Sequence, residues 1–156
     1  MEINFLAVVV AAISALVVGF VWYNPKVYGT AWMKAAGMTE EDVKGGNMLK
    51  IFGLSLLFAF FLAMSLHALV IHQTGVMSLT GGDIENALPS YAAFMQDYGD
   101  AFRTFQHGAL HGFLAGIFIA LPILGTNALF ERKSGKYIFI NAGYWIVTLT
   151  LMGAII

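Results

Sequence analysis

The chain has 156 residues, of which 59% are apolar and 11% are charged. A water-soluble domain usually carries about a quarter charged residues, so these charges are too few to cover a soluble globule. The eight Lys and Arg residues nearly balance the nine Asp and Glu residues, and no basic block is present that would bind nucleic acid. Cysteine is absent, which excludes a disulfide framework, a thiolate metal site and a cysteine nucleophile. The composition therefore indicates an integral membrane protein whose partner is the lipid bilayer.

Four uninterrupted apolar stretches have the length that a bilayer requires. They are residues 3–23, 51–71, 105–126 and 137–156, and none of them contains Lys, Arg, Asp or Glu. At about 1.5 Å per residue each stretch reaches roughly 30 Å, the thickness of the hydrocarbon core. Backbone amides cannot stay unpaired in lipid, and these runs are too long for barrel strands, so we expect four helices. The predicted fold is all-α: one transmembrane domain over residues 1–156, with short interfacial helices in the connections.

The cations of the connections predict the orientation of these helices. Seven of the eight lie in the first and third connections: Lys26, Lys34, Lys44, Lys50, Arg132, Lys133 and Lys136. The middle connection, residues 72–104, contains only Arg103. Because Lys and Arg concentrate on the cytoplasmic side, residues 24–50 and 127–136 are expected in the cytoplasm and both termini outside. The chain is then a multi-pass protein of the plasma (inner) membrane, with residues 72–104 on its outer side.

Proline, glycine and threonine signals predict short helices in two connections. Pro25 suits a first helical position and Gly37 a helix stop, while Thr39 can cap a second helix. In the middle connection a helix is expected near Pro89, followed by aromatic residues at helical spacing. This helix either lies at the interface over the outer mouth of the bundle or forms a lid over a vestibule.

A row of small residues marks one face of the third stretch. Gly108, Gly112 and Gly116 recur every four residues, and such a row lets another backbone approach closely. The spacing does not distinguish packing within one bundle from packing between subunits. Because four helices of this size bury only a thin core, we favour self-association into a homo-oligomer.

Histidines near the outer ends of the second and third stretches form a candidate site. His107 and His111 are four residues apart and share a helical face. Counted inward from the ends of their spans, His67 and His111 lie at similar depths, so antiparallel neighbours could bring them together. His67, His107 and His111 are therefore candidate ligands for a divalent metal ion, or members of a proton relay. In the alternative interpretation each histidine hydrogen-bonds a neighbouring helix or lies at the wet interface, and no cofactor is bound.

Polar and aromatic residues gather at the opposite, cytoplasmic ends of the spans. The members of this cytoplasmic-side polar cluster are Trp22, Tyr23, Asn24, Asn127, Asn141 and Tyr144. Asparagine amides at this position either hold a polar ligand or cross-link helices, and the aromatic rings are typical of an interfacial belt.

The same region carries a resemblance that extends over nearly the whole chain. Its motifs are Trp22–Pro25 with Gly29 and Trp32, His111 with Gly112, Asn127–Glu131, Asn141–Tyr144, and Met152 with Gly153. In these motifs the chain resembles the bacterial domain-of-unknown-function 1761 family. The resemblance implies a small polytopic membrane protein of four helices, and it carries no settled activity.

The residue pattern ranks the possible functions. An enzyme is disfavoured, because the serines within the spans (Ser14, Ser55 and Ser65) lack a nucleophile motif and no intramembrane carboxylate could orient a histidine. We therefore expect no catalytic residues. The leading hypothesis is a small self-associating, non-enzymatic subunit that assembles or binds a protein partner of unknown identity. An oligomeric pore or small-solute pathway and an outer-face histidine site for a metal or proton are the alternatives.

Overall fold

The computed structural model describes residues 3–156, so the first two residues of the expected 1–156 domain lie outside the described residues. All regular structure over the described residues is helical. In chain order the elements are α1 (Phe5–Trp22), the π-helix η1 (Pro25–Gly29), α2 (Thr30–Ala36), α3 (Glu40–Lys44), α4 (Met48–Val70), α5 (Gln73–Ser78), α6 (Pro89–Tyr98), α7 (Phe105–Ala115), the π-helix η2 (Gly116–Ala120), α8 (Leu121–Phe130) and α9 (Gly135–Ile155).

Four long apolar helices confirm the expected all-α membrane fold. They cover Phe5–Trp22, Met48–Val70, Phe105–Phe130 and Gly135–Ile155, and each is long and apolar enough to cross a bilayer. The third of them combines α7, η2 and α8 and runs four residues past the predicted end at Thr126. Short helices lie between the long ones, as predicted.

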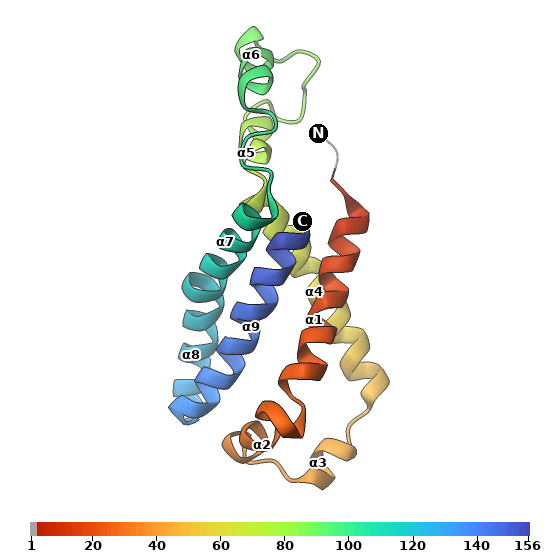
Figure 1. Cartoon of the computed structure of the whole chain (residues 1–156), viewed down its shortest axis with the longest axis vertical. Helices are drawn as coiled ribbons and strands as arrows, with labels where there is room; N and C mark the ends of the chain where they lie inside the picture. Colours follow the sequence, from red (N-terminus) through yellow and green to blue (C-terminus); the bar gives the residue numbers. More distant parts are fainter. Residues whose placement is uncertain (1–2) are drawn as a thin grey trace.

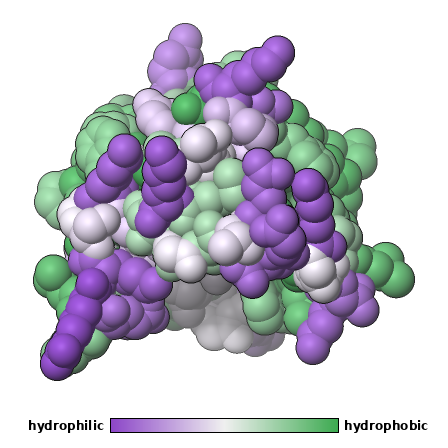
Figure 2. Space-filling view, turned by 90° about the horizontal axis from the view of Figure 1, so that it is seen from below, coloured by the Kyte–Doolittle hydropathy of each residue, from purple (hydrophilic) through white to green (hydrophobic). Residues whose placement is uncertain are grey.

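The long helices run side by side, and the chain reverses direction after each of them (Figure 1). The start of α1 and the end of α9 lie at one end of the molecule, here called the termini end, and α5 and α6 extend beyond the long helices there (Figure 1). The opposite end carries α2, α3 and the turn between α8 and α9, and is here called the lysine end. Figure 2 views the lysine end and shows hydrophilic side chains spread over it, with hydrophobic surface at its flanks.

The core lies where α1, α4 and α9 meet. Val8, Ala11, Ala63, Leu66 and Met152 are almost fully buried there. Alanines on α1 and α4 let the two helix backbones approach closely, which replaces lipid contact by van der Waals packing. Many large apolar side chains instead face outward, as a lipid-exposed surface requires; Leu6, for example, is 74% exposed.

The glycine row packs α7 and η2 against α9 of the same chain. A Cβ atom on Gly108 would collide with the Gly153 carbonyl, and one on Gly112 would collide with the Leu149 carbonyl. A Cβ atom on Gly116 would lie 2.7 Å from the Ile146 Cα atom. The row is therefore occupied by an intrachain contact and does not by itself support self-association.

The third long helix widens into a π-turn where it passes η2. Pro122 has no N–H group, so it cannot donate to the carbonyl four residues earlier. Just before it, the Leu121 N–H bonds the Gly116 carbonyl five residues back, which is the π pattern. The widened turn lets the helix continue past the proline.

Two polar contacts organise the lysine end. The Lys133 Nζ atom donates to the Ala36 carbonyl at 2.9 Å, which joins the α8–α9 turn to the carboxyl end of α2. Thr39 and Asp42 form a capping box at the start of α3. The Thr39 backbone N–H and hydroxyl both donate to the Asp42 carboxylate, and they hold the pKa of Asp42 below its ordinary value.

Candidate metal centre

Three histidines converge at the termini end of the third long helix. The His72 and His107 Nε2 atoms are 2.8 Å apart, and the His111 and His107 Nε2 atoms are 3.0 Å apart. One ring nitrogen of each histidine lies within 4.8 Å of the other two. His72 is exposed, while His107 and His111 are half-buried. The cluster therefore combines three nitrogen donors with access to solvent.

His72 reaches the cluster because α4 stops just before it. Ile71 leaves the helix in an extended conformation, with φ −94° and ψ 93°. The turn is held by hydrogen bonds: the Ile71 N–H donates to the His67 carbonyl at 2.9 Å, and the Thr74 hydroxyl donates to the Ile71 carbonyl at 2.7 Å. His72 thus projects from a fixed turn, away from the α4 helical path.

His107 and His111 lie on successive turns of α7. Thr104 caps this helix, and its side chain accepts a hydrogen bond from the His107 N–H at 3.3 Å. The glycines that pack against α9 lie directly after each histidine, at positions 108 and 112. The backbone under both imidazole rings is therefore held by the contact with α9.

Phe102 flanks the cluster and was not identified as a site residue from the sequence. Its backbone is in the left-handed region with φ 62°, which is uncommon for a bulky residue and persists only where surrounding contacts maintain it. The ring stacks on His107 at a centroid distance of 5.0 Å and meets His72 edge-on at 6.3 Å. Phe102 therefore covers one side of two histidine rings.

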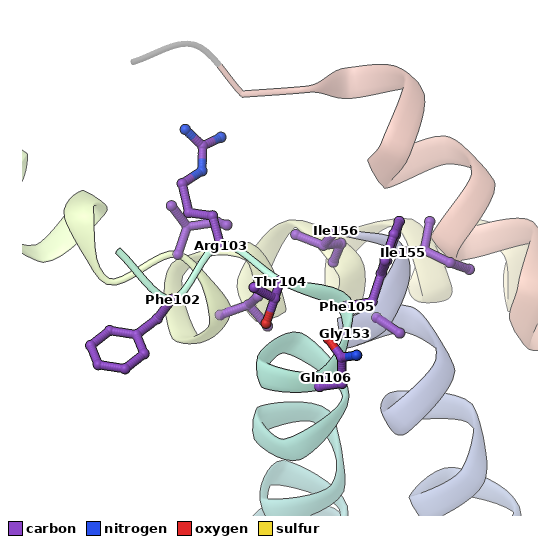
Figure 3. Close-up of a pocket in the computed structure, with 11 residues that line it drawn as sticks. Phe102, Arg103, Thr104, Phe105, Gln106, Gly153, Ile155 and Ile156 are labelled. Carbon is purple, nitrogen blue, oxygen red and sulfur yellow. The ribbon is translucent and has the colours of Figure 1, made fainter. Parts of the chain in front are cut away.

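A cavity of about 450 Å³ adjoins this side of the molecule (Figure 3). Phe102 borders it, together with Thr104 and Gln106 at the start of α7 and Ile155 and Ile156 at the end of the chain. In Figure 3 the Arg103 side chain points away from α7. The three clustered histidines do not line this cavity, and Phe102 is the residue that borders the cavity and also contacts the cluster.

The structure brings together two of the three expected histidines and adds a third that was not expected. His107 and His111 group with His72, whereas His67 lies on α4 with only 8% of its surface exposed. The depth count favoured His67 because His72 falls one residue beyond the expected span 51–71. His72 joins the cluster because α4 ends at Val70 and the chain turns there. The apolar pattern of the sequence does not locate that turn.

Most of the cytoplasmic-side polar cluster joins α1 to α9 at the lysine end. The Trp22 Nε1 atom donates to the Ile140 carbonyl at 3.0 Å, and the Tyr23 hydroxyl donates to the Asn141 Oδ1 atom at 2.9 Å. The Tyr144 hydroxyl donates to the Ala15 carbonyl at 2.9 Å. These hydrogen bonds link the two helices, as amide and hydroxyl groups do within membranes.

Two members of that cluster lie apart from the α1–α9 contact. The Asn24 side chain accepts from the Lys26 N–H at 2.9 Å and begins η1. Asn127 is exposed on α8. The structure thus gathers four of the six residues, and their polar groups serve helix contacts.

The comparison with protein families gives one match. The family described as "Protein of unknown function (DUF1761)" matches residues 6–156, which is nearly the whole chain. The chain belongs to this family. The comparison with curated proteins found no match, and neither did the comparison with solved structures. The description of the family names no activity.

Proposed function

We propose that this membrane protein binds a divalent transition-metal ion through His72, His107 and His111. The observation that carries the proposal is the convergence of three Nε2 atoms, two pairs of which are 2.8 and 3.0 Å apart. A tetrahedral zinc ion with Zn–N bonds near 2.0–2.1 Å holds its nitrogen ligands roughly 3.3 Å apart. Small rotations of the rings would therefore fit the ion.

The chemistry of the donors selects the class of ion. Neutral imidazole suits zinc, copper, nickel and iron, whereas magnesium and calcium prefer oxygen ligands. Three protein ligands leave a fourth position for water or an exchanging ligand, as in zinc sites that are not purely structural. The solvent access of His72 agrees with exchange of the ion.

A proton site is the second interpretation of the same residues. Without an ion, the two short contacts share the His107 Nε2 atom, which carries either one proton or one lone pair and can therefore make only one full hydrogen bond. Metal binding should weaken in acidic solution, because ligand nitrogens must be unprotonated to bind an ion.

We further propose that the site faces the outer side of the plasma membrane. The support is the seven cations in the connections at the lysine end, which mark the cytoplasmic side in membrane proteins. The histidines lie at the termini end. The ion would then exchange with the exterior.

The other functions considered from the sequence receive less support. A role as a non-enzymatic assembling or partner-binding subunit, alone or in a homo-oligomer, loses the argument from the glycine row, since that row contacts α9 of the same chain. A pore through one chain would need a polar lining, whereas Val8, Leu66 and Met152 fill the helix interface. The geometry favours the metal site.

Metal binding is tested by titrating the purified full-length protein with zinc and with cobalt. Wild type should bind one ion per chain, and cobalt should show the visible absorption of a tetrahedral site. Each of His72→Ala, His107→Ala and His111→Ala should lower the affinity by more than the roughly 10- to 100-fold that loss of an outer-shell contact costs.

The matched control is His67→Ala, which removes a histidine outside the cluster. It should keep the affinity of wild type, with folding of every variant checked by size-exclusion chromatography. If wild type binds neither ion, or if His67→Ala abolishes binding while His72→Ala does not, the proposed site is wrong.

A further inference from the structure

The segment between α4 and α7 forms an arm whose two ends meet at the histidine cluster. We define the arm as residues 73–101, which include α5 and α6. His72 immediately precedes it and Phe102 immediately follows it. Figure 1 shows α5 and α6 extending beyond the long helices, so the arm is joined to the bundle mainly at this root.

Gln73 ties the two ends of the arm together. Its side chain is almost fully buried, with 3% exposed, and its Nε2 atom donates to the Tyr98 carbonyl at 2.7 Å and to the Ala101 carbonyl at 3.0 Å. The Gln73 Oε1 atom is buried without a hydrogen-bond partner among the described residues. Among the described residues, the two bonds from Nε2 are therefore the hydrogen bonds that hold this side chain in place.

The two hydrogen bonds from the Gln73 amide, here called the clamp, hold the backbone next to His72 and Phe102, the two arm-end residues that contact His107. Gln73 is bonded to His72 in the chain, and the Ala101 carbonyl that it holds directly precedes Phe102. Phe102 stacks on His107, and His72 contributes a donor nitrogen to the cluster. A shift of the Gln73 side chain would therefore move a ligand and the ring that covers another ligand.

We propose that Gln73 is a positioning residue that couples the histidine cluster to the arm, so that a bound metal ion fixes the arm relative to the membrane helices. This inference rests on the metal binding proposed above. An ion would join His72, at the root of the arm, to His107 and His111 on α7. Without the ion, the link between His72 and His107 is a single hydrogen bond at an exposed site, where water competes for both rings.

The coupling must act in both directions. If the ion binds the protein better when the arm is fixed, then interactions that fix the arm raise the affinity for the ion by the same factor. The arm contains Asp83, Glu85, Asp97 and Asp100 and has no Lys or Arg. Metal binding would thus control where an acidic segment stands above the membrane.

Because the chain contains no cysteine, spin labels attach selectively to cysteines that are introduced. One label is placed on α6 through Ala93→Cys and one at the start of α1 through Phe5→Cys, both exposed positions. The distance distribution is measured by pulsed EPR in lipid nanodiscs with and without zinc, which is diamagnetic. Zinc should narrow the distribution in wild type, and His72→Ala should abolish the narrowing.

Gln73→Met tests the clamp with a side chain of similar length that lacks the amide. It should lower the zinc affinity about tenfold or more, as loss of a group that orients a ligand does. It should also leave the distribution broad at saturating zinc. The matched control is Ser78→Ala, which removes only the local bond from the Ser78 hydroxyl to the Gly75 carbonyl and should behave as wild type.

The outcomes separate this inference from the metal site itself. If zinc binds to wild type but the distance distribution does not change, the coupling is wrong and the metal site stands. The same holds if Gln73→Met binds zinc and narrows the distribution as wild type does. Failure of wild type to bind zinc overturns the metal site and the coupling together.

Discussion

The histidine cluster depends on single residues that leave helical geometry. Ile71 adopts an extended conformation and directs His72 away from α4, and Phe102 adopts φ 62° at the other end of the arm. A left-handed conformation costs an aromatic residue on the order of 1–3 kcal/mol, so the surrounding contacts must maintain it. The stacking of Phe102 on His107 is one such contact.

Replacing Phe102 tests whether this ring orients a ligand. Phe102→Leu keeps an apolar side chain but removes the ring that stacks on His107, so the imidazole can rotate. We expect the zinc affinity, measured by isothermal titration calorimetry, to fall about tenfold, in the range of outer-shell changes. Phe105→Leu, at a 77% exposed position three residues along the chain, is the control. Equal affinities for the two variants would show that Phe102 has no orienting role.

At the scale of elements, the contact between α7 and α9 supports the site. Gly108 and Gly112 let the two backbones approach so closely that carbonyl oxygens occupy the space of the missing Cβ atoms. His107 and His111 directly precede these glycines, so the distance between α7 and α9 also sets how far the imidazole rings lie from α9. Packing and site geometry are therefore linked through one helix face.

Gly112→Ala should destabilise the protein by about 1–3 kcal/mol, the usual cost of overpacking a close contact. The added methyl group must displace the Leu149 carbonyl, which is backbone and cannot move alone. Stability is measured by thermal unfolding in detergent. Gly53→Ala is the matched control on α4, where an added Cβ atom meets nothing within 4 Å, and it should leave stability unchanged or raise it. Equal unfolding temperatures for the two variants would contradict the packing account.

At the scale of the whole molecule, the chain reverses direction after each of the four long helices, so the start of α1, the end of α9 and the arm all lie at one end (Figure 1). The lysine end gathers the first and third connections, including the bond from Lys133 to the Ala36 carbonyl. Hydrophilic side chains cover that end, while the flanks are hydrophobic (Figure 2). This division is the physical basis for the proposed orientation.

The orientation predicts which introduced cysteines react from outside the cell. Glu85→Cys, in the arm, should be labelled by a membrane-impermeant maleimide in intact spheroplasts. Lys136→Cys, at the lysine end, should be labelled only after lysis. Both positions are exposed, so accessibility to solvent does not explain a difference between them. The reverse pattern would invert the assignment and place the histidines on the cytoplasmic side.

The sequence alone determined the number of spans, their approximate limits and the helical fold. Uninterrupted apolar runs of about 20 residues can satisfy their backbone in lipid only as helices, so local composition suffices for this inference. It also identified the glycine row and the shared face of His107 and His111, because both follow from helical periodicity.

Tertiary structure decided which partners these faces meet. The glycine row contacts α9, and no periodicity distinguishes that contact from one with another subunit. His72 joins His107 and His111 because α4 ends at Val70 and the chain turns there. Such turns, and the left-handed Phe102, depend on contacts between residues distant in the chain, which a pattern along the sequence does not encode.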